Sequence, residues 1–265
     1  MMRADLFLVE KGYVQSRQRA RDLIERGCVT VDGKTVTKPA FPISDGEHAV
    51  LVRDEIRYVG RGGLKLEAAL DGFGLDATGK FALDIGASTG GFTDCLLQRG
   101  ASAVCAVDAG AGQLAATLAA DPRVTSLEHK NARELTPEEI GGRPADLIVM
   151  DVSFISATYI LPQFPMLLHP DGSAVVLIKP QFEVGRAMLG KGGIVKDPRA
   201  HRYAVERVLE AGEALGLSAV GLMPSPITGG DGNREFLICF THRKTDERRV
   251  TEELLARVTA ARTSL

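Results

Sequence analysis

A glycine-rich turn between a buried strand and a helix constrains this chain most strongly. A strand is expected at 81–85, the turn reads Asp84-Ile-Gly-Ala-Ser-Thr-Gly-Gly91, and a helix is predicted from Phe92 onward. Glycine lets a ligand approach backbone N–H groups because no Cβ lies in the way. The next apolar run, 103–107, ends in Asp108, about 20 residues after the turn, where a carboxylate can accept both ribose hydroxyls of an adenosine-containing cofactor.

The glycine spacing distinguishes between two classes of cofactor. The dinucleotide fingerprint G-x-G-x-x-G is absent, because Ala87 and Ser88 follow the first glycine. A D-x-G-x-x-x-G-G turn resembles the first motif of S-adenosylmethionine-dependent methyltransferases, which implies S-adenosyl-L-methionine as cofactor. The simpler interpretation is an ordinary strand-to-helix turn with a helix-capping serine or threonine. The expected cofactor contacts are Asp84, Gly86, Ser88, Gly90, Gly91, Asp108 and, by its position after the third strand, Asn131.

Composition limits the class of protein without choosing a chemistry. The chain has 265 residues, 45% hydrophobic and 25% charged, which is typical of a soluble globular protein with one large domain and a small one. Its net charge of −2 means that nucleic-acid contacts must come from local basic patches. Apolar runs are strand-sized and the N-terminus does not resemble a secretory signal. We therefore expect a cytoplasmic protein without stable membrane association, whose oligomeric state the pattern leaves open.

The cysteines indicate no metal site. Cys28, Cys95, Cys105 and Cys239 are scattered beside apolar residues, without C-x-x-C spacing. Buried free thiols are expected, rather than zinc ligands or a disulfide framework.

Strand and helix patterns alternate beyond residue 80. Strands are expected near 81–85, 103–107, 124–128, 146–150, 173–178, 218–224 and 236–241. Helical spacing is found between them at 111–120, 156–167 and 200–215. Such alternation produces a mostly parallel sheet with helices on both faces, which binds ligands at the carboxyl ends of its strands. We therefore predict an α/β domain with a seven-stranded sheet, Rossmann-like as in class I methyltransferases.

Residues 1–56 have a different pattern, typical of a small α+β module. Ser16 is a suitable N-cap for a helix whose apolar stripe is flanked by basic residues, and Asp32-Gly33 predicts a tight turn between strands. Across residues 1–38, eight basic side chains and five acidic ones leave a charge of +3 (8 − 5). The basic residues are Arg3, Lys11, Arg17, Arg19, Arg21, Arg26, Lys34 and Lys38.

The order of these residues resembles the small RNA-binding module first known from ribosomal protein S-four. The pattern begins with Arg3-x-Asp5, continues through Ser16-Arg17 and ends with Val29-x-Val31-x-Gly33. The resemblance implies a basic helix pair and a β-turn that grip structured RNA, chiefly through phosphates and shape. The alternative is a solvated helix face without a partner. The expected RNA contacts are Arg3, Arg17, Arg21 and Lys34.

A glycine-rich segment joins the two parts. Residues 57–63 contain three glycines and two arginines, so we predict a linker that forms no stable helix. A methyltransferase domain is expected at 64–245, beginning with a helix at Leu64, and an amphipathic helical tail at 246–265.

Four polar residues lie where the strand pattern alone does not require them. Asp151 and Lys179 follow apolar strands, Glu235 precedes one, and Lys65 lies before the first strand of the domain. Each has an ordinary explanation, because carboxylates cap helices and lysines at strand ends are usually solvated. Their Lys-Asp-Lys-Glu order, however, resembles the catalytic tetrad of FtsJ-type 2′-O-ribose methyltransferases.

With the N-terminal module, this tetrad makes the chain similar to the TlyA family, ribosomal RNA methyltransferases long described as haemolysins. The resemblance implies methylation of a cytidine 2′-oxygen in 23S, and in some members also 16S, ribosomal RNA. The family linker carries tryptophan where this chain has Tyr58, so any coupling of linker and cofactor pocket is expected to differ. Local matches are 60–66, 84–91, 151–156, 178–183 and 229–235.

The chemistry needs these residue types because a ribose hydroxyl is a poor nucleophile. Alignment of oxygen, methyl group and sulfur supplies effective molarities of about 10⁵–10⁸ M, and a positioned base contributes roughly 10²–10⁴-fold. Lys179 is the expected base, a role that requires an uncharged amine. Alternatively, both lysines stay charged and stabilise the developing alkoxide. Asp151 and Glu235 are expected to orient the lysines and the hydroxyl.

Three other functions compete with this interpretation. A membrane-damaging haemolysin finds no support in the sequence, which has no insertion segment. A nicotinamide-dependent dehydrogenase is disfavoured by Asp84-x-Gly86 and by Lys179 at a strand end. A non-catalytic RNA-binding assembly factor is disfavoured by the intact tetrad and glycine turn.

Overall fold

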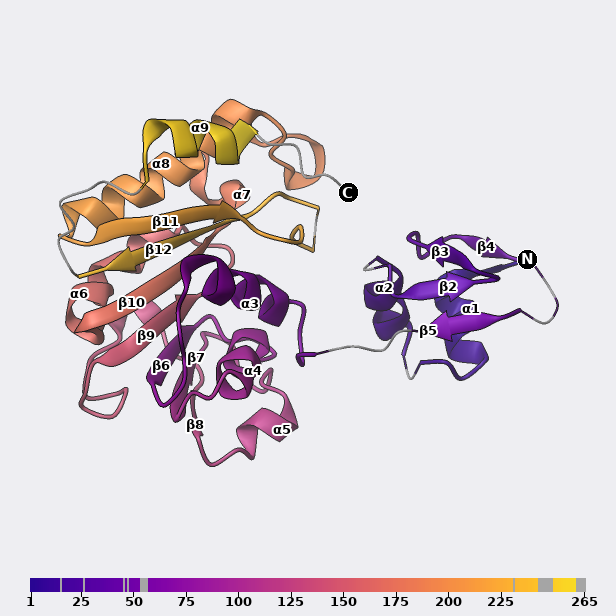
Figure 1. Cartoon of the computed structure of the whole chain (residues 1–265), viewed down its shortest axis with the longest axis horizontal. Coiled ribbons are helices and arrows are strands. Elements are labelled where there is room, and N and C mark those ends of the chain that lie inside the picture. Colours follow the sequence, from indigo (N-terminus) through magenta and orange to yellow (C-terminus); the bar gives the residue numbers. More distant parts are fainter. Residues whose placement is uncertain are drawn as a thin grey trace. The chain divides into compact units, whose positions relative to one another are not determined.

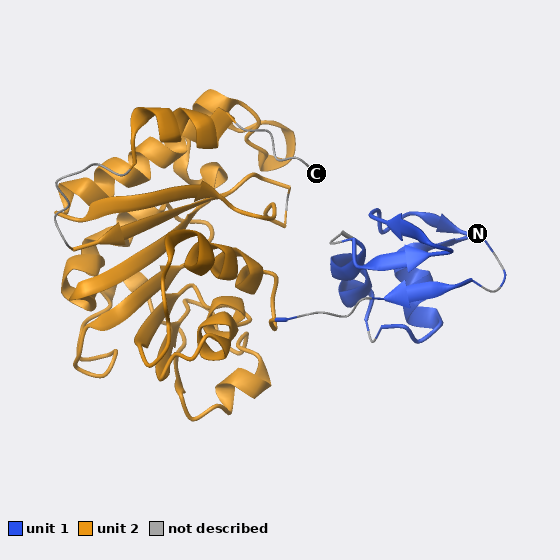
Figure 2. Cartoon of the chain, viewed as in Figure 1, with its two compact units in different colours: residues 1–57 blue, residues 58–265 orange. Residues whose placement is uncertain are grey.

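The computed structural model describes residues 1–14, 16–25, 27–44, 46, 48–52, 57–230, 232–242 and 250–260. The chain divides into two compact units, Met1–Arg57 and Tyr58–Leu265, here called unit 1 and unit 2 (Figure 2). Each has its own hydrophobic core. Arg26, one of the basic residues counted above, lies outside the described residues.

Unit 1 is an α+β unit in which helices α1 (Ala4–Glu10) and α2 (Arg17–Glu25) pack together. Ala20, Leu23 and Ile24 have no exposed surface, so the predicted apolar stripe is the buried face of α2. Asp32 and Gly33 have φ of 50° and 76°, as a two-residue type I′ hairpin requires. The strands of unit 1 pair antiparallel. Strand β1 (Met2–Arg3) pairs with β4 (Pro42–Ile43), and β2 (Val29–Val31) pairs with both β3 (Lys34–Val36) and β5 (Val50–Val52).

Unit 2 contains the predicted seven-stranded sheet, in the order β11-β12-β10-β9-β6-β7-β8 (Figure 1). Strand β12 is antiparallel to both of its neighbours, whereas the other pairings are parallel. The strand order reverses between β6 and β9, and ligands bind at such a reversal in sheets of this type. The strands are β6 (Phe81–Ile85), β7 (Ala103–Val107), β8 (Val124–Leu127), β9 (Ala145–Met150), β10 (Leu168–Ile178), β11 (Ser218–Pro224) and β12 (Phe236–Thr241).

Helices cover both faces of this sheet, because alternate side chains of each strand point to opposite sides. Leu147 of β9 packs in a cluster with α3 (Gly62–Phe73), α4 (Gly91–Gln98) and α5 (Ala116–Ala119). Its neighbour Ile148 packs in the other cluster, with α6 (Phe164–Leu167), α8 (Pro198–Ala214) and α9 (Glu252–Ala260). The short helix α7 (Pro180–Glu183) follows β10 and contacts α8.

Two predicted helices are shorter than their patterns suggested. The segment 111–120 is helical only at α5, because Gly112 with φ of 65° interrupts it. The segment 156–167 forms two 3₁₀ turns, 157–159 and 161–163, before α6. Pro162 and Pro165 lack the N–H groups that a continuous helix would need there. By contrast, α8 matches the prediction for 200–215 closely.

The prediction of a helix-free linker at 57–63 is wrong at its end, since α3 already begins at Gly62. Tyr58 is buried, and Val59 N donates a 2.7 Å hydrogen bond to Asp94 Oδ2. Glycine is needed here for packing rather than for flexibility, because a Cβ on Gly63 would lie 2.3 Å from Tyr58 Cγ. Residues 58–63 are therefore a packed edge of unit 2.

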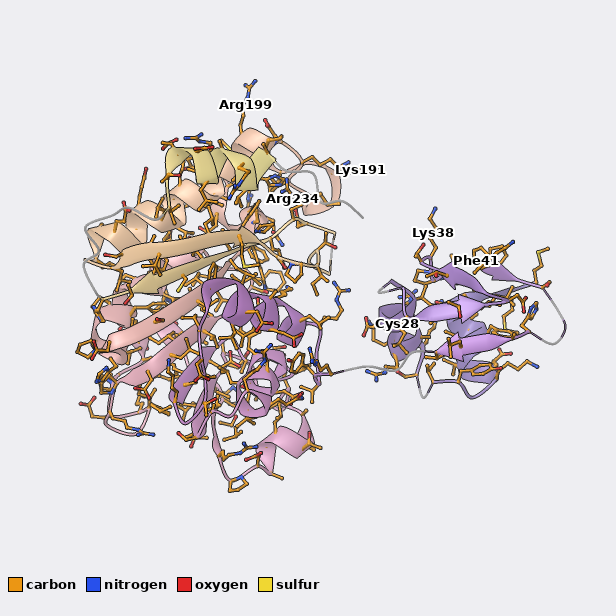
Figure 3. All side chains as sticks on the ribbon, in the orientation of Figure 1. Cys28, Lys38, Phe41, Lys191, Arg199 and Arg234 are labelled. Carbon is orange, nitrogen blue, oxygen red and sulfur yellow. The ribbon has the colours of Figure 1, made fainter. Side chains whose placement is uncertain are left out.

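The C-terminal helix α9 lies within the expected amphipathic tail, of which 246–249 and 261–265 fall outside the described residues. Arg234 donates hydrogen bonds to the carbonyls of Val258 and Thr259 at the end of α9, each 3.2 Å long (Figure 3). A guanidinium at a helix C-terminus satisfies carbonyls that lack helical partners. Across the described part of the chain, no helix combines the length and hydropathy that a membrane crossing needs.

Gly63→Ala is expected to lower the free energy of unfolding of unit 2 by about 1–3 kcal/mol, because the added methyl group would overlap the Tyr58 ring. Differential scanning calorimetry of the full chain measures the loss. Gly62→Ala is the matched control one residue earlier, since its Cβ would meet Phe92 at an ordinary 3.4 Å. Equal melting temperatures for the two variants would contradict this packing.

Candidate functional site

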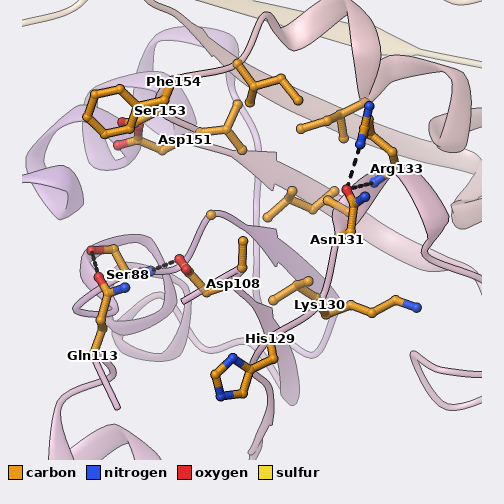
Figure 4. A pocket seen from close by; sticks show the side chains of 18 residues that line it. Ser88, Asp108, Gln113, His129, Lys130, Asn131, Arg133, Asp151, Ser153 and Phe154 are labelled. Atoms are coloured by element: carbon orange, nitrogen blue, oxygen red, sulfur yellow. Dashed lines mark hydrogen bonds between the residues drawn. The ribbon is translucent and has the colours of Figure 1, made fainter. Parts of the chain in front are cut away.

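The ends of four parallel strands surround a cavity of about 670 Å³. Gly86 and Ser88 come from the turn after β6, and Asp108 follows β7. Asn131 comes from the segment after β8, and Asp151 follows β9. Figure 4 shows the side chains of Ser88, Asp108, Asn131 and Asp151 around the cavity. The predicted strand-end residues thus lie at one edge of the sheet, where the strand order reverses.

The glycine turn depends on the absence of side chains at two positions. Gly86 has φ of +85°, and a Cβ there would lie 2.5 Å from the carbonyl oxygen of Asp151. Gly90 has φ of +94°, and its Cβ would lie 2.3 Å from Leu118 Cδ1. A larger residue at either position would therefore be strained, and it would push the turn away from the end of β9 at residue 86 or from Leu118 at residue 90.

Asp108 is held by backbone donors at the rim of the turn. Ser88 N donates to its Oδ2 at 2.8 Å (Figure 4). Gly110 N donates to its Oδ1 at 2.7 Å. Each carboxylate oxygen has lone pairs beyond these bonds, so both retain the capacity to accept a ligand hydroxyl.

Asn131 lines the cavity, but its amide is engaged in its own 3₁₀ turn, 132–134. Its Oδ1 accepts from Arg133 N at 3.2 Å, and its Nδ2 donates to Glu134 Oε1 at 3.0 Å. This fixes the side chain in one orientation at the wall.

Asp84, Gly90 and Gly91 do not line this cavity, unlike the other residues expected to contact the cofactor. The Asp84 carboxyl is fully buried beneath the turn and accepts a 2.6 Å hydrogen bond from Thr93 Oγ1 in α4. Burial raises the pKa of Asp84 to about 7, against the hydrogen bond from Thr93, which lowers it. Asp84 therefore supports the turn from behind.

A smaller cavity of about 180 Å³ adjoins the large one. The two share Gly86, Ser88, Asp151 and Ser153, so they meet at the ends of β6 and β9. The small cavity is lined in addition by Lys179 and by the segment 60–62. Two ligands, one in each cavity, would therefore meet beside Asp151.

The four residues of the predicted tetrad form two ion pairs. Lys179 Nζ lies 2.6 Å from Asp151 Oδ1, and it donates a 2.7 Å hydrogen bond to Ser153 Oγ. Lys65 Nζ lies 2.5 Å from Glu235 Oε2, with both side chains buried. Neither Asp151 Oδ1 nor Glu235 Oε2 accepts a hydrogen bond, so the attraction within both ion pairs is chiefly one of charge.

The two pairs lie within electrostatic range of each other. Burial raises the pKa of Glu235, and the charge of Lys65 opposes the shift. The charge of Asp151 also raises this pKa, and the charge of Lys179 lowers it. A Cβ on Gly62, in the helix that carries Lys65, would lie 3.8 Å from Asp151 Oδ2. The structure thus brings together all four side chains that the sequence singled out.

Three further side chains support the site and were not predicted. Ser153 holds the Lys179 amine. Asn233, almost fully buried, accepts from Val195 N and donates to Gly193 O, which fixes the segment leading to Glu235. Glu183 accepts from Ser156 Oγ at 2.5 Å and from Ala157 N at 2.7 Å, which ties α7 to the loop after β9. Each lies inside a family-like motif, which is the only signal in the sequence that pointed to it.

Comparison with known proteins places the same two parts in the chain. Residues 58–242 match the FtsJ-like methyltransferase family, and residues 2–48 match the S4 domain. The 16S/23S rRNA (cytidine-2′-O)-methyltransferase TlyA of Mycobacterium tuberculosis is 47% identical over 89% of this chain and 88% of that protein. Hemolysin A of Brachyspira hyodysenteriae is 43% identical over 90% of this chain and 99% of that protein.

Solved structures agree with these matches. A candidate hemolysin from Streptococcus thermophilus superposes with a TM-score of 0.75 at 40% identity, covering 98% of this chain and 94% of that one. An S-adenosylmethionine-dependent methyltransferase from Mesorhizobium loti has a TM-score of 0.51 at 18% identity, over 68% of this chain and 99% of that one. The second likeness concerns the fold alone.

Asp84→Asn is expected to gain stability relative to the wild-type chain as the pH rises from about 4 to about 7. The wild-type carboxyl has a pKa near 3.8 when unfolded and about 7 when folded, so the folded state binds more protons across this window and loses stability as they dissociate. The slope is at most about 1.4 kcal/mol per pH unit, and the difference is constant above pH 7. Urea denaturation at several pH values measures it.

Asp76→Asn is the control of opposite sign. Asp76 is exposed, and the hydrogen bond from Thr78 N lowers its pKa. The Asp76→Asn variant should therefore lose stability relative to the wild-type chain as the pH rises. If the difference in unfolding free energy between Asp84→Asn and the wild-type chain stays constant from pH 4 to 7, that result would contradict the assigned burial of Asp84.

Proposed function

We propose that this chain, which belongs to the FtsJ-like methyltransferases and within them to the TlyA family, methylates the 2′-oxygen of a cytidine in 23S or 16S ribosomal RNA. The observation that carries the proposal is the pair of amine–carboxylate contacts, Lys179–Asp151 and Lys65–Glu235, beside two adjoining cavities. The substrate follows from the printed function of the Mycobacterium tuberculosis relative and from the N-terminal RNA-binding module.

The large cavity suits S-adenosyl-L-methionine. Its volume lies in the range of about 300–1,000 Å³ that small-ligand sites occupy. Asp108 would accept the ribose hydroxyls, Gly86 would leave room for the methionine part, and Asn131 would lie at the adenine edge. Ser88 would add a polar contact, while Asp84, Gly90 and Gly91 would keep the turn in place. When bound, this cofactor supplies a methyl group on a sulfonium that is already a good leaving group.

The small cavity would receive the ribose of the target nucleotide. Its shared wall, at Asp151 and Ser153, is where the acceptor oxygen would come closest to the large cavity. The strand ends around the site would hold the oxygen in line with the methyl group and the sulfur before the reaction. This alignment would accelerate the reaction more than any single contact does.

Lys179 is the residue we place next to that oxygen. The oxygen loses its proton as it gains the methyl group, and the Lys179 amine would take up the proton or, as an ammonium, stabilise the negative oxygen. Asp151 and Ser153 fix the amine on two sides. Lys65 and Glu235 line neither cavity, and they would help to orient the Lys179 amine and the hydroxyl through their charges.

Lys179→Ala is expected to reduce methyl transfer to ribosomal RNA by at least about 100-fold, the scale of a positioned proton-transfer group. Affinity for S-adenosyl-L-methionine should stay nearly unchanged, because Lys179 does not line the large cavity. Transfer of labelled methyl groups and calorimetric titration measure the two effects. A rate that rises with pH would identify the amine as a base.

Lys80→Ala is the matched control, because Lys80 precedes β6 and so lies at the opposite edge of the sheet. It should retain wild-type turnover. Retained turnover in Lys179→Ala would contradict both roles proposed for this amine.

The N-terminal module would bind the RNA. Arg3, Arg17 and Arg21 lie on and before its two helices, and Lys34 begins β3 at the hairpin. All four would contact phosphates, so recognition would rest mainly on shape and charge. A protein that acts on ribosomal RNA would also work in the cytoplasm, where ribosomes assemble.

Lys34→Ala is expected to weaken RNA binding and to reduce the slope of log affinity against log salt by about one unit, since one phosphate contact is lost. Fluorescence anisotropy across a salt series measures both. An unchanged slope would exclude Lys34 from the interface.

The haemolysin name of one relative suggests membrane damage as an alternative. Membrane damage requires none of the buried ion pairs that this site contains. The two ion pairs and the cofactor-sized cavity therefore favour the enzyme.

A further inference from the structure

Three arginines of unit 1 converge on one carboxylate. Arg3 donates to Asp5 from Nε at 2.9 Å and from Nη2 at 3.1 Å. Arg17 Nε and Arg21 Nε donate to Asp5 Oδ2 at 2.9 and 3.3 Å. Asp5 has no exposed surface, whereas the three arginine side chains are 42–49% exposed. We call these four residues the Asp5 cluster.

The three arginines of the Asp5 cluster carry more positive charge than its one carboxylate neutralises. Hydrogen bonds from the guanidiniums, that of Arg3 first, hold the pKa of Asp5 well below its usual range, so the carboxylate is charged at neutral pH. Three arginines and one aspartate leave a surplus of +2 (3 − 1). Like charges repel each other unless a counter-charge holds them, and Asp5 is that counter-charge.

The cluster also leaves donors pointing away from Asp5. Arg17 and Arg21 use only Nε, and within the described residues their Nη groups donate to no protein atom. They lie one helical turn apart on α2, so their free edges share one face. A guanidinium can bind a carboxylate with one edge and a phosphate with another, which a lysine cannot do.

We propose that Asp5 is a positioning residue for RNA, a buried carboxylate that assembles Arg3, Arg17 and Arg21 into a single clamp for backbone phosphates. The inference rests on the proposed RNA binding by this module and adds the residue that organises it. It has a consequence opposite to simple electrostatics, because removal of a negative charge from a phosphate-binding surface then weakens RNA binding.

The test compares Asp5→Asn with Asp22→Asn in the full chain. Among the described residues, Asp22 on α2 of the same module accepts only an exposed hydrogen bond from Gln18, and both variants add one positive charge. The probe is an in vitro transcript of 23S ribosomal RNA, with affinity measured by filter binding across a salt series. Asp5→Asn should bind about 10-fold more weakly and with a shallower salt slope, whereas Asp22→Asn should bind as tightly as the wild-type chain or more tightly.

A structural role alone gives a different result. If Asp5 only pins α1 to α2, Asp5→Asn lowers the melting temperature of unit 1, but below that temperature it binds the transcript as tightly as Asp22→Asn does. That outcome overturns the inference. Circular dichroism at the binding temperature establishes that unit 1 is folded.

Arg17→Lys decides the question if Asp5→Asn does not fold. It keeps the charge of +1 but cannot bridge Asp5 and a phosphate, so it should bind several-fold more weakly than Arg19→Lys, a control on the same helix. Equal affinities overturn the inference. If Arg3→Ala, Arg17→Ala and Arg21→Ala all bind the transcript like the wild-type chain, the proposed RNA contacts fail instead.

Discussion

The proposed catalytic edge of this protein depends on a buried contact between two opposite charges. Lys65 and Glu235 lie far apart in the sequence, yet both are buried and in contact. Burying either charge alone would cost several kcal/mol, so each requires the other. Their contact joins the start of α3 to the start of β12. Asn233 and the packed segment 58–63 hold the two sides of this contact in place.

The proposed cofactor and acceptor positions are linked through one backbone contact, between Gly86 and Asp151. The turn after β6 can lie against the carbonyl of Asp151 only because residue 86 is glycine. Asp151 in turn holds Lys179, which lines the neighbouring cavity. A displacement of the turn would therefore move the cofactor wall and the tetrad together. In unit 1, too, a buried carboxylate determines where cationic side chains lie. Asp5 binds the three arginines that we assign to RNA binding.

The sequence predicted the sheet well because buried strands are apolar runs that end in polar residues, as at 147–151 and 174–179. Through the resemblance to a family, it also singled out four side chains that the structure brings together, Lys65, Asp151, Lys179 and Glu235. It failed where local chemistry overrides periodicity, at Pro162, Pro165 and Gly112. It could not reveal the partners of Asp5 or Asn233, since these depend on which distant side chains meet. The segment 57–63 was predicted to form no helix because the packing of the Tyr58 ring on Gly63 is visible only in three dimensions.

The central claim is that the two amine–carboxylate pairs serve the methylation of a ribose oxygen in ribosomal RNA. Mapping of 2′-O-methylation on 23S and 16S ribosomal RNA, from cells with the gene intact and from cells in which it is deleted, tests this most directly. The account predicts that at least one cytidine loses its 2′-O-methyl group on deletion and regains it with the wild-type gene but not with Lys179→Ala. Identical methylation maps from the two strains would contradict the account.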